Sequence, residues 1–178
     1  VSMVNHAMNY IPSLQLYVDA TAKEVPFGLL PDSAWGKPVI HVGAAKALAT
    51  IPAEDHMNNQ QQLHLTLKVL PSGAASGTLK VSIKGGRAAG ARAYFRELDA
   101  DGMRDFVRHS AQRAGWRARG TLDRGNTEGL SDTYSYSMQF EIENFLRAGT
   151  SGAFMLSSLF GSPLDVTHLG DVADRPTP

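Results

Sequence analysis

The stretch LHLTLKVLPSGAASGTLKVSIKG, residues 63–85, decides the fold of this chain. Apolar and polar residues alternate along 63–71 and again along 78–85, and SGAASG lies between the two runs. A period of two is typical of strands with one buried face, so we expect an antiparallel hairpin. One face carries the apolar residues, and the other carries polar ones. In the first strand, the apolar face consists of Leu63, Leu65, Leu67 and Val69, and the polar face consists of His64, Thr66 and Lys68.

Helical patterns follow this hairpin, over 88–98 and 99–114. Asp99 is expected to cap the second helix and Gly115 to end it, because an Asp side chain accepts backbone N–H groups and a glycine tolerates positive φ. Apolar and small residues at helical spacing predict the buried stripe of that helix: Met103, Phe106, Val107, Ser110 and Ala114.

Strand patterns return after the helices, at 117–123, 132–143 and 153–158. YSYSMQFEI alternates clearly, and one face of it is expected to be buried. The residues of that face are Tyr134, Tyr136, Met138, Phe140 and Ile142. The whole pattern predicts an α+β fold, a mainly antiparallel β-sheet with a helical insertion.

Composition narrows the classes of function. The 178 residues hold 17 Lys and Arg against 17 Asp and Glu, which argues against nucleic acid as the main partner. No apolar run is long enough to span a membrane, and the first residues lack the pattern of a signal peptide. There is no cysteine, which excludes disulfides, zinc–thiolate sites and a cysteine nucleophile within these residues. Cytoplasm and periplasm both remain open.

The opening residues 5–22, NHAMNYIPSLQLYVDATA, read as a second hairpin. With Pro12 and Ser13 at the centre of the turn, His6 would lie opposite Asp19, and opposed side chains point to the same face. An imidazole oriented by a carboxylate is the base-and-orienter half of a nucleophilic triad. The alternative reading is a structural pair that satisfies two polar groups on a sheet.

These same residues carry a resemblance to a family. N-H-A-x-x-Y followed by L-Y-V-D-A-T resembles the second half of the transglutaminase-like core, with Ala20 where D-P-T is common. VPFGLLPDSAWGKPVIHV, residues 25–42, and GLSDTYSYSMQFEI, residues 129–142, resemble a narrower group. Its members are bacterial transglutaminase-like proteins with an N-terminal domain of unknown function before the core and a β-rich region after it.

The resemblance implies a domain organisation. Residues 1–42 would be the closing strands of a transglutaminase-like, papain-like core, and 43–61 would be a junction. Residues 62–178 would form a β-rich C-terminal domain with its helices near 88–114. The chain would thus be the C-terminal part of a longer protein whose cysteine and helix lie upstream of Val1.

The resemblance also implies an activity: acyl transfer or amide hydrolysis on protein or peptide amides through a Cys thiolate. His6 would be the general base and acid, and Asp19 its orienter. This chain alone would be inactive, and its partners would be the missing N-terminal part and a peptide or protein substrate. No cofactor is implied. A homo-oligomer through exposed strands stays open, and the resemblance favours the periplasm.

A different class of function also fits, a non-catalytic β-rich binding or interaction module. Trp35 and Trp116, with Tyr134 and Tyr136, would then line a ligand face, although aromatic residues on one strand face are more often core. The other histidines are scattered without the spacing of ligands, so no metal site is predicted: His41, His56, His64, His109 and His168. Gly85-Gly86-Arg87 is expected to be a strand-to-helix turn rather than a phosphate loop.

Overall fold

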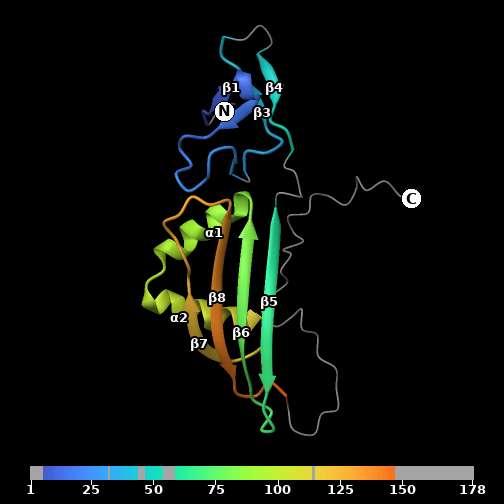
Figure 1. Cartoon of the computed structure of the whole chain (residues 1–178), viewed down its shortest axis with the longest axis vertical. Helices are drawn as coiled ribbons and strands as arrows, with labels where there is room; N and C mark the ends of the chain where they lie inside the picture. Colours follow the sequence, from blue (N-terminus) through green and yellow to red (C-terminus); the bar gives the residue numbers. More distant parts are fainter. Residues whose placement is uncertain (1–5, 32, 44–46, 54–58, 114, 147–178) are drawn as a thin grey trace, which may run out of the picture.

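The computed structural model describes residues 6–31, 33–43, 47–53, 59–113 and 115–146. They form two parts, an N-terminal unit (the described residues of 6–53) and a C-terminal unit (those of 59–146). The N-terminal unit lies at one end of the long sheet of the C-terminal unit (Figure 1). The expected α+β class, with mainly antiparallel sheets and two helices, is confirmed.

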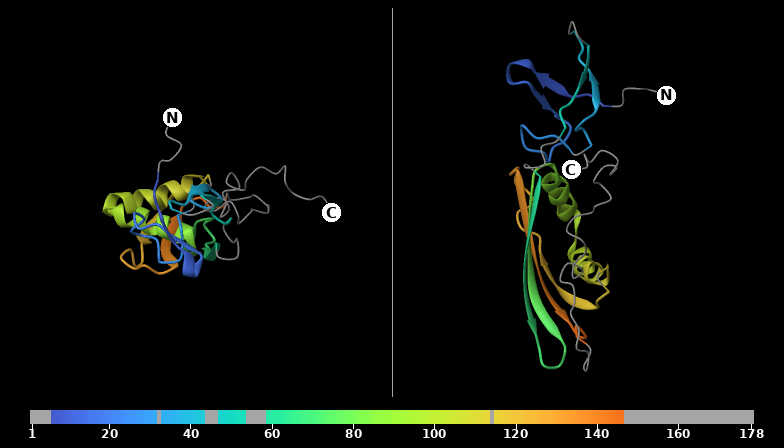
Figure 2. Two further views of the ribbon diagram at one scale, coloured as in Figure 1. Left: turned by 90° about the horizontal axis from the view of Figure 1, so that it is seen from above. Right: turned by 90° about the vertical axis from the view of Figure 1, so that its right-hand side faces the viewer.

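The C-terminal unit is built on a four-stranded sheet. Its strands are β5 (Gln60–Val69), β6 (Ala75–Lys84), β7 (Ala118–Asp123) and β8 (Thr133–Ile142), in the order β5-β6-β8-β7. The hairpin predicted over 63–85 is confirmed as β5 and β6. Every neighbouring pair of strands is antiparallel. Both helices lie on one face of the sheet, so the structure has two layers (Figure 2).

A helical crossover joins β6 to β7. Both strands are antiparallel to β8, which lies between them, so they are parallel to each other. Parallel strands cannot be joined by a tight turn, because the chain must return along the sheet. The helices α1 (Gly86–Glu97) and α2 (Ala100–Arg113) make this return, which explains why they interrupt the strands.

The ends of the helices follow the sequence expectations. The Asp99 Oδ1 atom accepts a hydrogen bond from the Gly102 N–H at 2.7 Å, which confirms the predicted N-cap of α2. Gly115, just after α2, has φ +82°, and Gly85, just before α1, has φ +91°. Both values lie in the region that favours glycine. Of the predicted α2 stripe, Val107 and Ser110 are buried; Met103 and Phe106 are half-buried, and Ala114 lies outside the described residues.

The core lies between the helices and the sheet. Tyr134, Met138, Phe140 and Ile142 are buried and Tyr136 is half-buried, which confirms the predicted inner face of β8. Phe95 of α1 contacts the rings of Phe106, Tyr134 and Tyr136. The Trp116 ring packs on Phe145 with 5.0 Å between centroids. Three of the four aromatic residues considered for a ligand face, Trp116, Tyr134 and Tyr136, are therefore core residues.

The N-terminal unit consists of two short hairpins. One pairs β1 (Asn9–Ile11) with β2 (Leu16–Val18), and the other pairs β3 (Pro38–Ile40) with β4 (Leu48–Thr50). β4 falls within 43–61, the stretch expected to be a junction. The strand expected at 153–158 lies outside the described residues.

The predicted register of the first hairpin is wrong by two residues. Ile11 pairs with Leu16 rather than with Leu14, because Pro12–Leu14 form a turn of 3-10 helix. Gln15 closes the turn at φ 50° in the left-handed region, and its N–H bonds to the Pro12 carbonyl at 3.2 Å. A proline at the start of such a turn is favoured because its φ is already set.

Candidate functional site

His6 and Asp19 meet in the N-terminal unit, as the sequence predicted. The His6 Nε2 atom lies 2.9 Å from the Asp19 Oδ2 atom. The two residues are not directly opposed, because the register is displaced by two. Side chains alternate with a period of two along a strand, so a displacement of two keeps the same face. The two side chains therefore still meet, whereas a register displaced by one residue would have put them on opposite faces of the hairpin.

Asp19 is held as a carboxylate. Its side chain is only 5% exposed, and its Oδ1 atom accepts the Thr21 N–H at 2.9 Å and the Thr21 hydroxyl at 2.6 Å. Burial by itself raises the pKa of this carboxyl, but the hydrogen bonds from Thr21 and His6 act in the other direction and prevail, so the pKa of Asp19 is lowered.

The bond to Asp19 sets the chemistry of the His6 ring. An ionised carboxylate can only accept hydrogen bonds, so the Nε2 atom of His6 must carry the proton. In the neutral ring this leaves Nδ1 as the basic nitrogen. The His6 side chain is 44% exposed, whereas the carboxylate behind it is covered. An oriented, accessible imidazole of this kind can accept a proton from a reactant and return it.

A cluster of three rings joins the two hairpins; we call it the aromatic platform and define it as Tyr10 on β1, Tyr17 on β2 and His41, which follows β3. Tyr10 and Tyr17 are directly opposed on β1 and β2, with 4.7 Å between ring centroids. The His41 ring stacks on Tyr10 at 4.6 Å, and its Nε2 atom lies 2.9 Å from the Tyr17 hydroxyl oxygen. Burial, and then the neighbouring Tyr10, raise the pKa of Tyr17, so Tyr17 stays protonated at neutral pH. Sequence analysis missed this platform, because nothing in the spacing joins residue 41 to the hairpin.

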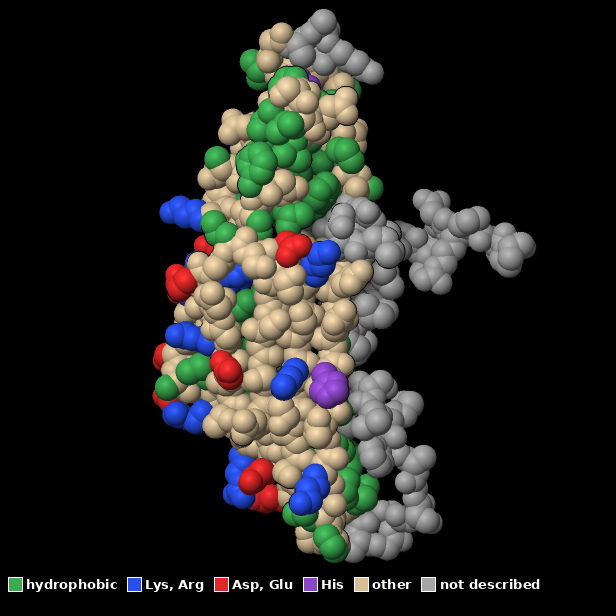
Figure 3. Space-filling model, viewed as in Figure 1, with side chains coloured by type: hydrophobic (Ala, Val, Ile, Leu, Met, Phe, Trp, Pro, Cys, Tyr) green, Lys and Arg blue, Asp and Glu red, His purple; other side chains and the backbone are tan. Residues whose placement is uncertain are grey.

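The N-terminal unit has little core of its own. Among its described residues, only Leu30 and Ile51 are buried hydrophobic side chains. Large apolar side chains are instead exposed, namely Tyr10, Leu14, Phe27, Ile40, Val42 and Leu48. Figure 3 shows hydrophobic side chains gathered over this unit, in contrast to the mostly polar sheet face beside it. Exposed apolar surfaces of this kind are typical of interaction sites.

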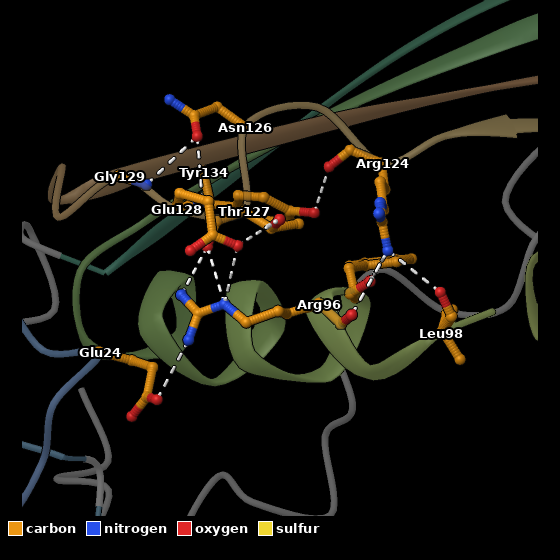
Figure 4. A network of polar contacts seen from close by, with 10 residues as sticks. Glu24, Arg96, Leu98, Arg124, Asn126, Thr127, Glu128, Gly129 and Tyr134 are labelled. Carbon is orange, nitrogen blue, oxygen red and sulfur yellow. Dashed lines mark hydrogen bonds and ion pairs between the residues drawn. The ribbon is translucent and has the colours of Figure 1, made fainter.

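Two arginines of α1 join the two units. The Arg92 guanidinium, with the residue only 1% exposed, donates to the Glu24 carbonyl at 3.3 Å and to the Ser131 carbonyl at 2.6 Å. Arg96 donates to the Glu24 carboxylate at 3.3 Å and also bonds the Thr127 carbonyl (Figure 4). Because Glu24 lies five residues after Asp19, these contacts anchor the segment that follows the His6–Asp19 pair.

The outer face of the sheet is polar. A row of four side chains crosses it in register, His64 on β5, Lys80 on β6, Ser137 on β8 and Asp123 on β7. They line a shallow concavity of about 490 Å³. Within the described part of the chain, no group of three or more His, Asp or Glu side chains is arranged to hold a metal. No helix in that same part is both long and apolar enough to cross a membrane.

Comparisons with known proteins found no similar protein. No protein-family model matches the chain, and neither a curated protein nor a solved structure matches it.

Proposed function

We propose that these residues are the His- and Asp-bearing part of a transglutaminase-like cysteine acyltransferase or amidohydrolase that acts on protein or peptide amides. The observation that carries the proposal is the bond between His6 and Asp19, with a buried carboxylate behind an accessible imidazole. The residues N-H-A-x-x-Y and L-Y-V-D-A-T support it, because they resemble that family at these two positions.

The reaction needs a thiol that the 178 residues do not contain, since they hold no cysteine. A cysteine-bearing body would place its thiol at the Nδ1 atom of His6, which accepts the proton. The thiolate attacks the carbonyl carbon of the substrate amide and forms a C–S bond. The C–N bond breaks, and the leaving amine takes the proton back from His6. A second amine or water then attacks the thioester carbon while His6 accepts its proton. The C–S bond breaks, and the departing thiolate takes that proton from His6 and becomes the thiol again.

Asp19 acts on His6 throughout this cycle. It keeps the Nε2 atom protonated, so that Nδ1 is the nitrogen presented to the thiol. It also stabilises the imidazolium while His6 carries the extra proton. The lowered pKa of Asp19 supports this role, because the group stays charged at neutral pH.

The exposed apolar face of the N-terminal unit supports an incomplete assembly. Among its described residues the unit has two buried hydrophobic side chains and six large exposed ones, which is little burial for a fold of this size. We propose that the cysteine-bearing part of the same core covers this face. The thiol and His6 would then meet at the boundary between the two bodies.

The test uses the native protein isolated from the cells that produce it, captured by an antibody against these 178 residues. Intact mass and N-terminal sequencing first establish whether a cysteine-bearing segment is present. Incorporation of a fluorescent primary amine into casein, and release of ammonia, then measure transfer and hydrolysis. His6→Gln is expected to lower both by a factor of about 10²–10⁴, the usual worth of a general base.

Controls separate chemistry from folding. His109→Gln changes an exposed histidine on α2 and is expected to keep full activity. Asp19→Asn removes the orienting charge and should lower activity while the circular dichroism spectrum stays unchanged. If His6→Gln retains activity within twofold of the parent protein, His6 is not the base and the proposal fails. Absence of any cysteine-bearing segment would also defeat it.

A non-catalytic binding module is the second candidate. The observation that favours it is the polar concavity crossed by His64, Lys80, Ser137 and Asp123, which has the hydrogen-bonding groups of a ligand site. Under this reading the His6–Asp19 bond is structural. Loss of binding of a peptide or glycan ligand on Lys80→Ala, with His6→Gln unchanged, would favour the module.

A further inference from the structure

We propose that the aromatic platform of Tyr10, Tyr17 and His41 is a recognition subsite for an aromatic side chain of the acyl-donor peptide, beside the His6–Asp19 pair. The inference rests on the proposed function for the identity of the substrate. The structural part of it, a site that selects aromatic rings, stands without any catalytic activity.

Tyr10 and Tyr17 are directly opposed and share one face of the hairpin, and each is separated by an even number of positions from a member of the His6–Asp19 pair. Tyr17 lies two positions before Asp19, and Tyr10 lies two positions after Met8 and four after His6. Side chains at such even spacing point to the same face of a strand, and positions two apart are separated by about 6.6–6.8 Å. An extended peptide advances about 3.3–3.6 Å per residue. Tyr10 therefore lies about 13 Å along the strand from His6, so the substrate residue over the platform would be about four positions from the amide at His6.

The chemistry of the platform fits an uncharged ring. Tyr10 is 37% exposed, and its ring belongs to a stacked pair with His41, with 26° between the ring planes. The polar side-chain atoms of the platform are the Tyr10 hydroxyl, the Tyr17 hydroxyl and His41 Nε2 that bond each other, and the His41 Nδ1 atom. Flat, polarised ring surfaces attract another ring in an offset or tilted stack. A charged side chain would lose hydration on such a surface, whereas an uncharged ring would not. The nearby Asp19 oxygens are already bonded to His6 and Thr21.

A purely structural role is the competing explanation. The Tyr17–His41 bond ties the hairpin β1–β2 to the end of β3, so the platform also holds the two hairpins together. A structural role predicts that replacement of Tyr10 changes stability but not the preference between ligands. A subsite predicts the reverse, because Tyr10 is the most accessible of the three rings.

The experiment measures binding by NMR on the 178-residue chain. The probes are N-acetyl-phenylalaninamide and N-acetyl-leucinamide, which differ in the ring and not in charge. We expect the phenylalanine probe to bind about fivefold more tightly, as one added ring contact predicts, and to shift the signals of Tyr10, Tyr17 and His41. Tyr10→Leu should abolish that preference. Tyr94→Leu is the matched control, because Tyr94 is an exposed tyrosine on α1, and it should keep the preference.

Each outcome decides between the readings. Equal affinity of the parent chain for the two probes overturns the subsite, as does a preference that survives Tyr10→Leu. His6→Gln in the same assay separates this inference from the proposed function. The subsite predicts that His6→Gln keeps the ring preference. If the ring preference is present in this chain, while His6→Gln leaves amide turnover intact in the cysteine-bearing protein purified from the cell, the subsite stands and the catalytic proposal falls.

Discussion

Replacement of Arg92 by methionine tests how the two units are held together. Arg92→Met keeps an unbranched side chain of similar reach but removes every donor. Three backbone carbonyls lose a partner: Glu24 at 3.3 Å, Ser131 at 2.6 Å and Thr133 at 3.2 Å. The guanidinium also lies 5.6 Å from the centre of the Tyr134 ring, and that contact is lost too.

The expected size of the effect follows from two opposing terms. A hydrogen bond to a charged group is worth about 1.5–3 kcal/mol, so three give roughly 4.5–9 kcal/mol. Burial of the charge costs several kcal/mol in the other direction, and the same burial is the main reason that the pKa of Arg92 is lowered. We expect Arg92→Met to lower the free energy of unfolding by about 2–4 kcal/mol, since three partly buried bonds to a charged donor are lost.

Urea denaturation measures this loss. With a slope of about 2 kcal/mol per M, the midpoint should fall by roughly 1–2 M. Hydrogen exchange at the amides around Glu24 should rise, because the anchor of that segment is gone. Arg108→Met is the matched control on α2, where the arginine is 54% exposed and pairs only with Asp105 at 2.8 Å. Its effect should stay below about 0.5 kcal/mol. An Arg92→Met chain as stable as the parent would refute the reasoning, because burial of the charge would then outweigh the three bonds.

Three further predictions concern the C-terminal unit. Gly77→Ala should lower the free energy of unfolding by about 1–3 kcal/mol in urea denaturation, because the added Cβ would lie 2.7 Å from the Phe140 Cζ atom. Gly90→Ala on α1 should instead raise it by about 0.5–1 kcal/mol, because the added Cβ would have nothing within 4 Å. Asp99→Ala should cost about 1 kcal/mol and fray the start of α2, measured by circular dichroism during thermal unfolding. Burial raises the pKa of Tyr134 to about 12, partly offset by Arg124 and Arg92. The stability that Tyr134 contributes should therefore be complete below pH 10 and lost as the pH rises through about 12. Absorbance titration at alkaline pH should show late-titrating tyrosines, and Tyr134→Phe should remove one that titrates near pH 12; a titration unchanged by that substitution would contradict the assignment.

Sequence patterns predicted the C-terminal unit well because its elements are long and strongly periodic. Alternation over 63–85 and 132–143 indicated both hairpin and inner face, and the structure confirms β5, β6 and β8 there. The N-cap at Asp99 could be predicted because the capping hydrogen bond comes from Gly102, only three residues away. Interactions within one turn or one strand depend on local spacing, which a sequence displays directly.

The first hairpin shows where local reasoning fails. Pro12 was rightly placed in the turn, but the turn is one of 3-10 helix that takes in Gln15 at positive φ. No residue in the loop is of a type that indicates a 3-10 turn followed by a residue at positive φ. The contact between His6 and Asp19 was nevertheless predicted, because the face of a strand depends only on whether a position is odd or even.

By itself the sequence determined the α+β class, the caps and turns of the helices, the inner face of β8, and the pairing of His6 with Asp19. Only the tertiary structure brought His41 onto Tyr10, set Arg92 between Glu24 and Ser131, and left the apolar side chains of the N-terminal unit exposed. The physical reason is distance along the chain. A contact between residues 31 or 68 positions apart depends on how whole elements pack, and packing is decided by the sum of many side chains rather than by the spacing of a few.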